Sequence, residues 1–67
     1  MLTEIKRLDG YYCLHVDGRR MIERESFEVV NRIKERLDNP ELDDFSEATE
    51  VARSIRDYLN QKDIPYV

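Results

Sequence analysis

Cys13 and His15 are the side chains best suited to metal binding or nucleophilic catalysis, and they stand two residues apart. On a strand, this spacing places both side chains on the same face of a sheet. A zinc site needs three or four protein ligands, and the sequence holds no other cysteine or histidine, so Glu4 or a second chain would have to complete it. A Cys–His nucleophile also lacks an identifiable oxyanion donor. We therefore predict no metal, no cofactor and no catalytic residue, in a protein that is not an enzyme.

The densest run of carboxylates lies between residues 38 and 50. Its members are Asp38, Glu41, Asp43, Asp44, Glu47 and Glu50. A calcium-binding loop needs a central glycine, which this run lacks, and the run contains Pro40. Two interpretations stay open. The run is either a solvated loop with a helix N-terminus, or it acts through its charge, as a docking surface for a basic partner or as an imitation of phosphate charge.

A second set of residues combines cations with ring side chains. Its members are Lys6, Tyr11, His15, Arg20 and Arg24. Three-stranded sheets can lie in the major groove of DNA, and aromatic side chains on a sheet can stack on bases. The cations are few and Glu4 lies among them, so the other interpretation is that long basic side chains cover apolar surface while their charged ends stay in water.

The charge is unevenly distributed along the 67 residues, which carry a net charge of −4. Residues 1–36 hold eight basic and seven acidic side chains, a net charge of +1, whereas residues 37–67 hold three and eight, a net charge of −5. This balance argues against a phosphate-binding surface that covers the whole molecule. It leaves room for a small basic patch on one face.

The first third of the chain reads as three strands joined by two tight turns. Asp-Gly pairs at residues 9–10 and 17–18 are typical of two-residue hairpin turns, and the aromatic and β-branched residues between them favour a strand. The implied register places Leu14 opposite Met21 and Tyr12 opposite Glu23. One face then carries the core residues Ile5, Tyr12, Leu14, Val16 and Met21. The other carries Lys6, Leu8, Tyr11, Cys13, His15, Arg20, Ile22 and Arg24, so either that face is partly covered or a bulge shifts the register.

Two helices should follow the strands. Ser26 is a suitable N-cap for a first helix, whose apolar stripe is Phe27, Val30, Ile33 and Leu37. Pro40 ends that helix, because it pushes the residue before it out of the helical region. A second helix starts at Pro40 or at Asp44. In the latter case, residues 44–47 would form a capping box with Asp44 as its first residue. Its stripe is Ala48, Val51, Ala52, Ile55, Tyr58 and Leu59.

The sequence therefore predicts a single α+β domain of order β-β-β-α-α, with both helices on one face of a three-stranded antiparallel meander. The expected segments are 2–25 for the meander, 26–38 and 40–61 for the helices, and 62–67 for a tail that is either loose or paired with an edge strand. A chain this short has a small stability margin, so a homodimer through leftover apolar surface is compatible with it.

The compartment and the class of function follow from the same counts. One cysteine forms no internal disulfide, and no apolar stretch reaches the length of a signal peptide or a membrane span, so we expect a cytoplasmic protein. We predict a small interaction module, a regulator or inhibitor of the kind that phages and bacteria encode. It would bind another protein through the acidic segment and residual apolar sheet surface. The alternative is nucleic-acid binding by the basic and aromatic sheet face.

Overall fold

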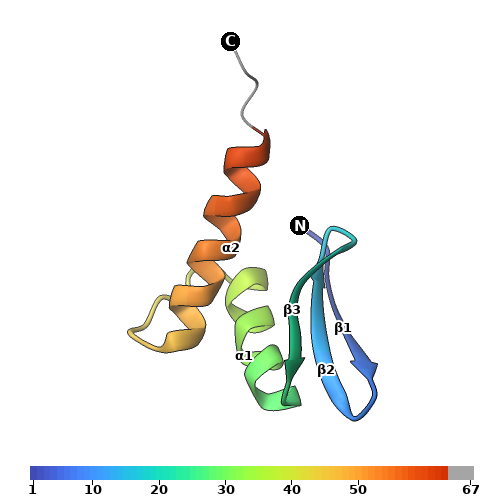
Figure 1. Cartoon of the computed structure of the whole chain (residues 1–67). Coiled ribbons are helices and arrows are strands. Elements are labelled where there is room, and N and C mark those ends of the chain that lie inside the picture. The colour runs from blue at the N-terminus through green and yellow to red at the C-terminus, as the bar shows by residue number, and fades with distance from the viewer. Residues whose placement is uncertain (64–67) are drawn as a thin grey trace.

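The structure of the chain, a computed structural model, describes residues 1–63 and their side chains through Gln61. Its elements are β1 (Thr3–Leu8), β2 (Tyr11–Val16), β3 (Arg19–Glu25), α1 (Phe27–Asp38) and α2 (Glu47–Asp63). The strands form one antiparallel sheet in the order β1-β2-β3. Figure 1 shows α1 against one face of this sheet and α2 beside α1. The predicted β-β-β-α-α fold is confirmed.

Both predicted hairpin turns are present, and their backbone explains the Asp-Gly pairs. Asp9 and Gly10 have φ values of 50° and 80°, and Asp17 and Gly18 have 52° and 82°. Two successive residues with positive φ define the type I′ turn, which matches the twist of the strands it joins. The β1–β2 register follows as predicted, with Ile5 opposite Leu14.

The register of β3 departs from the prediction at Met21. Leu14 pairs with Ile22, where an unbroken ladder would pair it with Met21. The extra residue in β3 is a β-bulge, which shifts the side chains after it. As a result Ile22, predicted to lie on the outer face, packs against the core, and Met21 does so as well.

A second irregularity follows in the same strand. Tyr12 pairs with Glu25, where the predicted partner was Glu23. Arg24 lies within this irregular stretch and has a φ of 59°, in the left-handed region that a residue with a Cβ seldom adopts. The bulged end of β3 therefore carries backbone strain at Arg24.

The core lies between the sheet and α1 and extends to α2. The buried core residues are Leu14, Val16, Val30, Ile33, Leu37, Ala52 and Ile55. The half-buried residues packed against them are Ile5, Tyr12, Met21, Ile22, Ala48, Val51 and Leu59. Phe27, predicted to be a core residue, is half exposed and meets the ring of Tyr12 edge-on, with ring centroids 5.3 Å apart. It sits at the first position of α1, where the helix has only begun to cover the sheet.

The predicted start is correct for the first helix and wrong for the second. Ser26 caps α1 as expected, since its Oγ accepts a hydrogen bond from the backbone N–H of Val29 at 3.3 Å. The second helix starts neither at Pro40 nor at Asp44, because the cap is Ser46, whose Oγ accepts from the N–H of Thr49 at 3.3 Å. The predicted end at residue 61 is also early, as α2 continues to Asp63. The expectation for the remaining tail falls on residues 64–67, outside the described part.

Candidate functional site

Asp44 holds the connection between the two helices in place. One carboxylate oxygen of Asp44 accepts a hydrogen bond from Nη2 of Arg36 at 2.7 Å, and the other accepts from the backbone N–H of Ser46 at 3.0 Å. Asp44 also accepts from the hydroxyls of Ser46 and Thr49. Thr49 is the buried polar residue of the described chain, and this contact satisfies it. The loop and the start of α2 are therefore fixed by one carboxylate.

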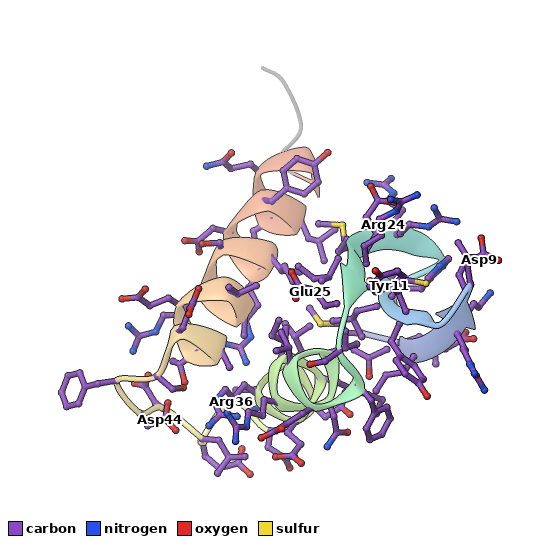
Figure 2. All side chains as sticks on the ribbon, turned by 60° about the horizontal axis from the view of Figure 1, so that its bottom comes forward. Asp9, Tyr11, Arg24, Glu25, Arg36 and Asp44 are labelled. Atoms are coloured by element: carbon purple, nitrogen blue, oxygen red, sulfur yellow. The ribbon has the colours of Figure 1, made fainter. Side chains whose placement is uncertain are left out.

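The ionisation of this group follows from its partners. The hydrogen bond from Arg36 is the main cause that holds the pKa of the Asp44 carboxyl well below its usual range, and bonds from Ser46 and Thr49 add to it. The same hydrogen bond raises the pKa of the Arg36 guanidinium. Arg36 is itself largely covered, and its Nε donates to the Thr49 hydroxyl at 3.0 Å. Figure 2 shows Arg36 and Asp44 together at the end of α1.

Two further members of the predicted acidic surface have partners inside the molecule. Asp38 accepts from Nζ of Lys34 at 2.6 Å and from the hydroxyl of Thr3 at 2.5 Å, so it ties the end of α1 to β1. Partial burial would raise the pKa of Asp38, but these two bonds outweigh it and the pKa is lowered. Asp43 pairs with Arg53 of α2. Asp38 therefore connects two elements of the fold, whereas the Asp43–Arg53 pair is exposed and contributes little to stability.

Glu41, Glu47 and Glu50 are the predicted acidic residues without an ion pair among residues 1–61. Glu41 lies in the connection between the helices, and Glu47 and Glu50 lie in the first turn of α2. All three are exposed. All six residues of the acidic run are exposed, but three have partners inside the molecule and three have no ion pair among residues 1–61.

An aromatic side chain stands within this acidic region. Phe45 is fully exposed, at 107% of the reference area, whereas Leu42 nearby is 45% exposed. Phe45 follows directly on Asp44 and precedes the cap residue Ser46, so its backbone is bounded on both sides by the Asp44 hydrogen bonds. We call residues 39–46 the Phe45 loop. Sequence reasoning did not single out Phe45.

Only some of the predicted basic and aromatic residues of the sheet lie close together. A hollow of about 190 Å³ opens on the outer face of the sheet, and Tyr11, Arg20 and Arg24 lie along it. Figure 2 shows Tyr11 and Arg24 on the side of the sheet that points away from α2. Lys6 and His15 do not line this hollow, so the structure brings together three of the five predicted residues.

The charge of this outer-face hollow is mixed. Asp9 and Glu23 also line it, and Arg20 pairs with Glu23 at 3.2 Å. Its apolar part includes Leu8 and Tyr11, which are 50% and 53% exposed. These two residues form the residual apolar surface that was expected on the sheet.

Cys13 and His15 have different surroundings. Cys13 is buried, and its thiol donates to the carbonyl oxygen of Lys6 at 3.4 Å. His15 is half-buried and lies opposite Arg20 in the sheet. Within residues 1–63, no three His, Cys, Asp or Glu side chains are grouped as metal ligands would be. In the same part of the chain, no helix has the length and hydropathy needed to cross a membrane.

Comparison of the chain with protein-family models, curated proteins and solved structures gives no match.

Proposed function

We propose that this chain is a small non-catalytic protein–protein interaction module that binds its partner through the Phe45 loop and the adjoining start of α2. The observation that carries the proposal is the full exposure of the Phe45 ring on a loop that Asp44 fixes. Phe45 would enter an apolar pocket of the partner. Glu41, Glu47 and Glu50 would face basic side chains around that pocket.

The energetic basis is an aromatic anchor that is ordered before binding. Burying an exposed phenyl group contributes roughly 2 to 3 kcal/mol, and the largest contributions to binding usually come from a few such anchors. Ordering a flexible loop on binding would offset part of this gain. The hydrogen bonds of Asp44 to Arg36 and Ser46 exist in the free protein, so the Phe45 loop avoids much of that cost.

The biological role we propose is that of a cytoplasmic regulator or inhibitor. Support for the compartment comes from Cys13, which is a buried free thiol. Support for a role through binding comes from the exposed Phe45 ring and the exposed carboxylates of Glu41, Glu47 and Glu50. Leu8 and Tyr11 on the outer sheet face supply additional apolar surface for the same class of contact.

The test compares two exposed aromatic residues at separate surfaces. Immobilised wild-type chain, F45S and Y11S are used to capture proteins from a nuclease-treated lysate of the source organism, and affinities for the captured partner are then measured by calorimetry. We expect the partner to bind wild type and Y11S, and to bind F45S at least about tenfold more weakly. F45L should retain part of the affinity because it keeps an apolar side chain.

The charges are tested separately with the triple variant E41K/E47K/E50K, which leaves the pairs of Asp43 and Asp44 intact. This variant should slow association and reduce the salt dependence of the rate. The proposal is wrong if F45S and the triple variant both bind the partner with wild-type affinity while they remain folded.

The second candidate is nucleic-acid binding at the outer-face hollow. It is favoured by the approach of Tyr11, Arg20 and Arg24 to one another, which would let a base stack on the ring while a phosphate meets a guanidinium. Fluorescence anisotropy with labelled single- and double-stranded oligonucleotides at low salt tests it. Binding that falls steeply with salt and is lost in Y11S but kept in F45S would support this candidate and contradict the first.

A further inference from the structure

The two edges of the sheet differ in regularity. β3 forms one edge, and its register shifts and the positive φ of Arg24 interrupt the even spacing of its backbone groups. β1 forms the other edge, and its pairing with β2 runs without a shift from Thr3 to Leu8. Bulges protect an edge from pairing with another chain, whereas a regular edge strand can accept one more strand. In the described part of the chain, β1 is therefore the edge that is open to a further strand.

The turn after β1 determines which of its backbone groups face outward. Leu8 and Tyr11 flank the two-residue turn and exchange hydrogen bonds, and from there bonded and non-bonded pairs alternate along the antiparallel ladder. The carbonyl oxygen of Leu2, which accepts from the N–H of Asp17 at 2.7 Å, follows the same alternation. The even-numbered residues thus bond toward β2, and the odd-numbered residues of β1 present their N–H and C=O groups to the open edge. These odd-numbered residues are Thr3, Ile5 and Arg7.

The open edge restricts how a second copy of β1 can pair with it. A two-fold axis perpendicular to the sheet makes the two strands antiparallel, and outward-facing residues must then lie opposite one another. A pairing centred on Ile5 uses all the outward-facing residues of both copies. A pairing centred on Glu4 or on Lys6 leaves one outward-facing residue of each copy beyond the end of the other β1. The backbone therefore favours the pairing centred on Ile5.

The charges of β1 select the same register. In the pairing centred on Ile5, Glu4 of each copy lies opposite Lys6 of the other, so opposite charges meet twice. In a pairing centred on Glu4 or on Lys6, like charges meet at the two-fold axis. Opposite charges directly across two strands stabilise the pairing, and like charges destabilise it. Glu4 and Lys6 are both exposed and have no ion pair among residues 1–61, so both are available for this contact.

The remaining pairs of this register are also complementary. Leu2 and Leu8 are 60% and 50% exposed, and the register places Leu2 of each copy opposite Leu8 of the other on the outer face. On the inner face, the exposed Arg7 lies opposite Thr3 of the other copy. The hydroxyl of Thr3 donates to Asp38, so Arg7 of one copy approaches a carboxylate of the other.

We propose that β1 is the interface of a homodimer with two-fold symmetry, in which the sheets of two copies join edge to edge by antiparallel pairing centred on Ile5. α1 covers a face of the sheet and leaves its edge open, and Figures 1 and 2 show β1 at the opposite side of the molecule from α2. This inference goes beyond the proposed function, which uses Leu8 only as additional apolar surface. Phe45, beside the start of α2, stays free to bind a partner in each copy.

An exchange of charge between positions 4 and 6 gives the decisive test. E4K places a lysine opposite Lys6 of the other copy, and K6E places a glutamate opposite Glu4. Each should dimerise about tenfold more weakly than the wild type, measured by sedimentation of the full chain at concentrations up to about 1 mM. The double variant E4K/K6E restores opposite charges at both contacts, so it should regain most of the wild-type affinity. An equimolar mixture of E4K and K6E should form a heterodimer for the same reason.

The backbone contact is tested separately at Arg7. R7A removes the side chain and keeps the N–H at the open edge, whereas R7P removes this N–H as well, at a position where an edge strand tolerates proline. R7P should dimerise at least about tenfold more weakly than R7A. Arg20 supplies the matched control, because the same alternation points its N–H to the edge at β3, and R20P should dimerise as R20A does. Circular dichroism establishes that each variant is folded, and the charge variants decide the question even if R7P is not.

Three results would overturn the proposal. The first is a wild-type chain that sediments as a monomer over the whole concentration range. The second is a double variant E4K/K6E that dimerises no better than E4K and K6E. The third is a dimer that is lost in F45S, which would place the interface at the Phe45 loop. Because F45S should weaken partner binding and leave the dimer intact, this proposal and the proposed function can fail independently.

Discussion

Replacing Arg24 by glycine is expected to stabilise the fold. Arg24 has a φ of 59°, which brings its Cβ close to the following carbonyl group, whereas glycine has no Cβ and adopts this backbone freely. The left-handed conformation costs a residue with a Cβ about 1 to 2 kcal/mol. Glycine in turn makes the unfolded chain more flexible, which costs about 0.5 to 1 kcal/mol. The net gain for glycine over alanine is about 0.5 to 1 kcal/mol.

The comparison must separate the backbone from the side chain, because Arg24 also lines the outer-face hollow. R24A removes the arginine side chain and keeps the strain, so the difference between R24G and R24A measures the backbone alone. Arg20 in the same strand supplies the control, since its φ is not positive. There glycine should be less stable than alanine by about 0.5 to 1 kcal/mol.

Urea and thermal unfolding followed by far-ultraviolet circular dichroism measure both pairs. For a chain of this size, the expected gain at position 24 corresponds to a rise in Tm of roughly 2 to 8 °C from R24A to R24G. The sign should reverse between positions 24 and 20. If R24G is no more stable than R24A, the positive φ at Arg24 carries no strain and our account of the bulge fails.

Three more predictions follow from other parts of the structure. L14A should reduce the free energy of unfolding by about 2 to 5 kcal/mol in urea titrations, because Leu14 is fully buried in the core; a loss near zero would place the core elsewhere. The stability that Asp44 contributes should be complete above about pH 4, the usual range of an unfolded carboxyl, and should fall as the pH drops below it, because the folded pKa is lowered. D44N should lose that stability at neutral pH, and its urea midpoint should fall less than that of the wild type as the pH is lowered. If the two midpoints fall in parallel, the lowered pKa does not belong to Asp44. Cys13 should react with a thiol reagent far more slowly in native than in urea-unfolded protein, since it is 3% exposed, and equal rates would show that the sheet opens readily at Cys13.

The features that sequence reasoning predicted correctly depend on neighbours in the chain. The Asp-Gly pairs at residues 9–10 and 17–18 fix the two turns, because positive φ at both positions is a local requirement. Once the first turn is fixed, the whole β1–β2 register follows from it, as the pairing of Ile5 with Leu14 shows. The N-cap at Ser26 is local in the same way.

The features that sequence reasoning missed depend on contacts between distant segments. Alternation along β3 places Ile22 and Arg24 on the outer face, yet the bulge at Met21 sends Ile22 to the core. Sequence reasoning offered a bulge as one explanation of the mixed outer face, but no turn residue marks its position in β3. The bulge allows both Met21 and Ile22 to pack against the core. The alternation of side chains along one strand does not predict this, because it depends on packing with the other elements.

The exposure of Phe45 follows from the same kind of competition. Phe45 lies three residues before Ala48, so a helix begun at Asp44 would place its ring on the apolar stripe of α2. Instead, one oxygen of Asp44 accepts from Arg36 of the preceding helix and the other accepts from the backbone N–H of Ser46, and Ser46 caps the helix two residues later. Phe45 is then outside the helix, and its ring faces solvent. Because α2 begins only after Ser46, a residue that could have joined the core is instead the strongest candidate for an anchor at an interface.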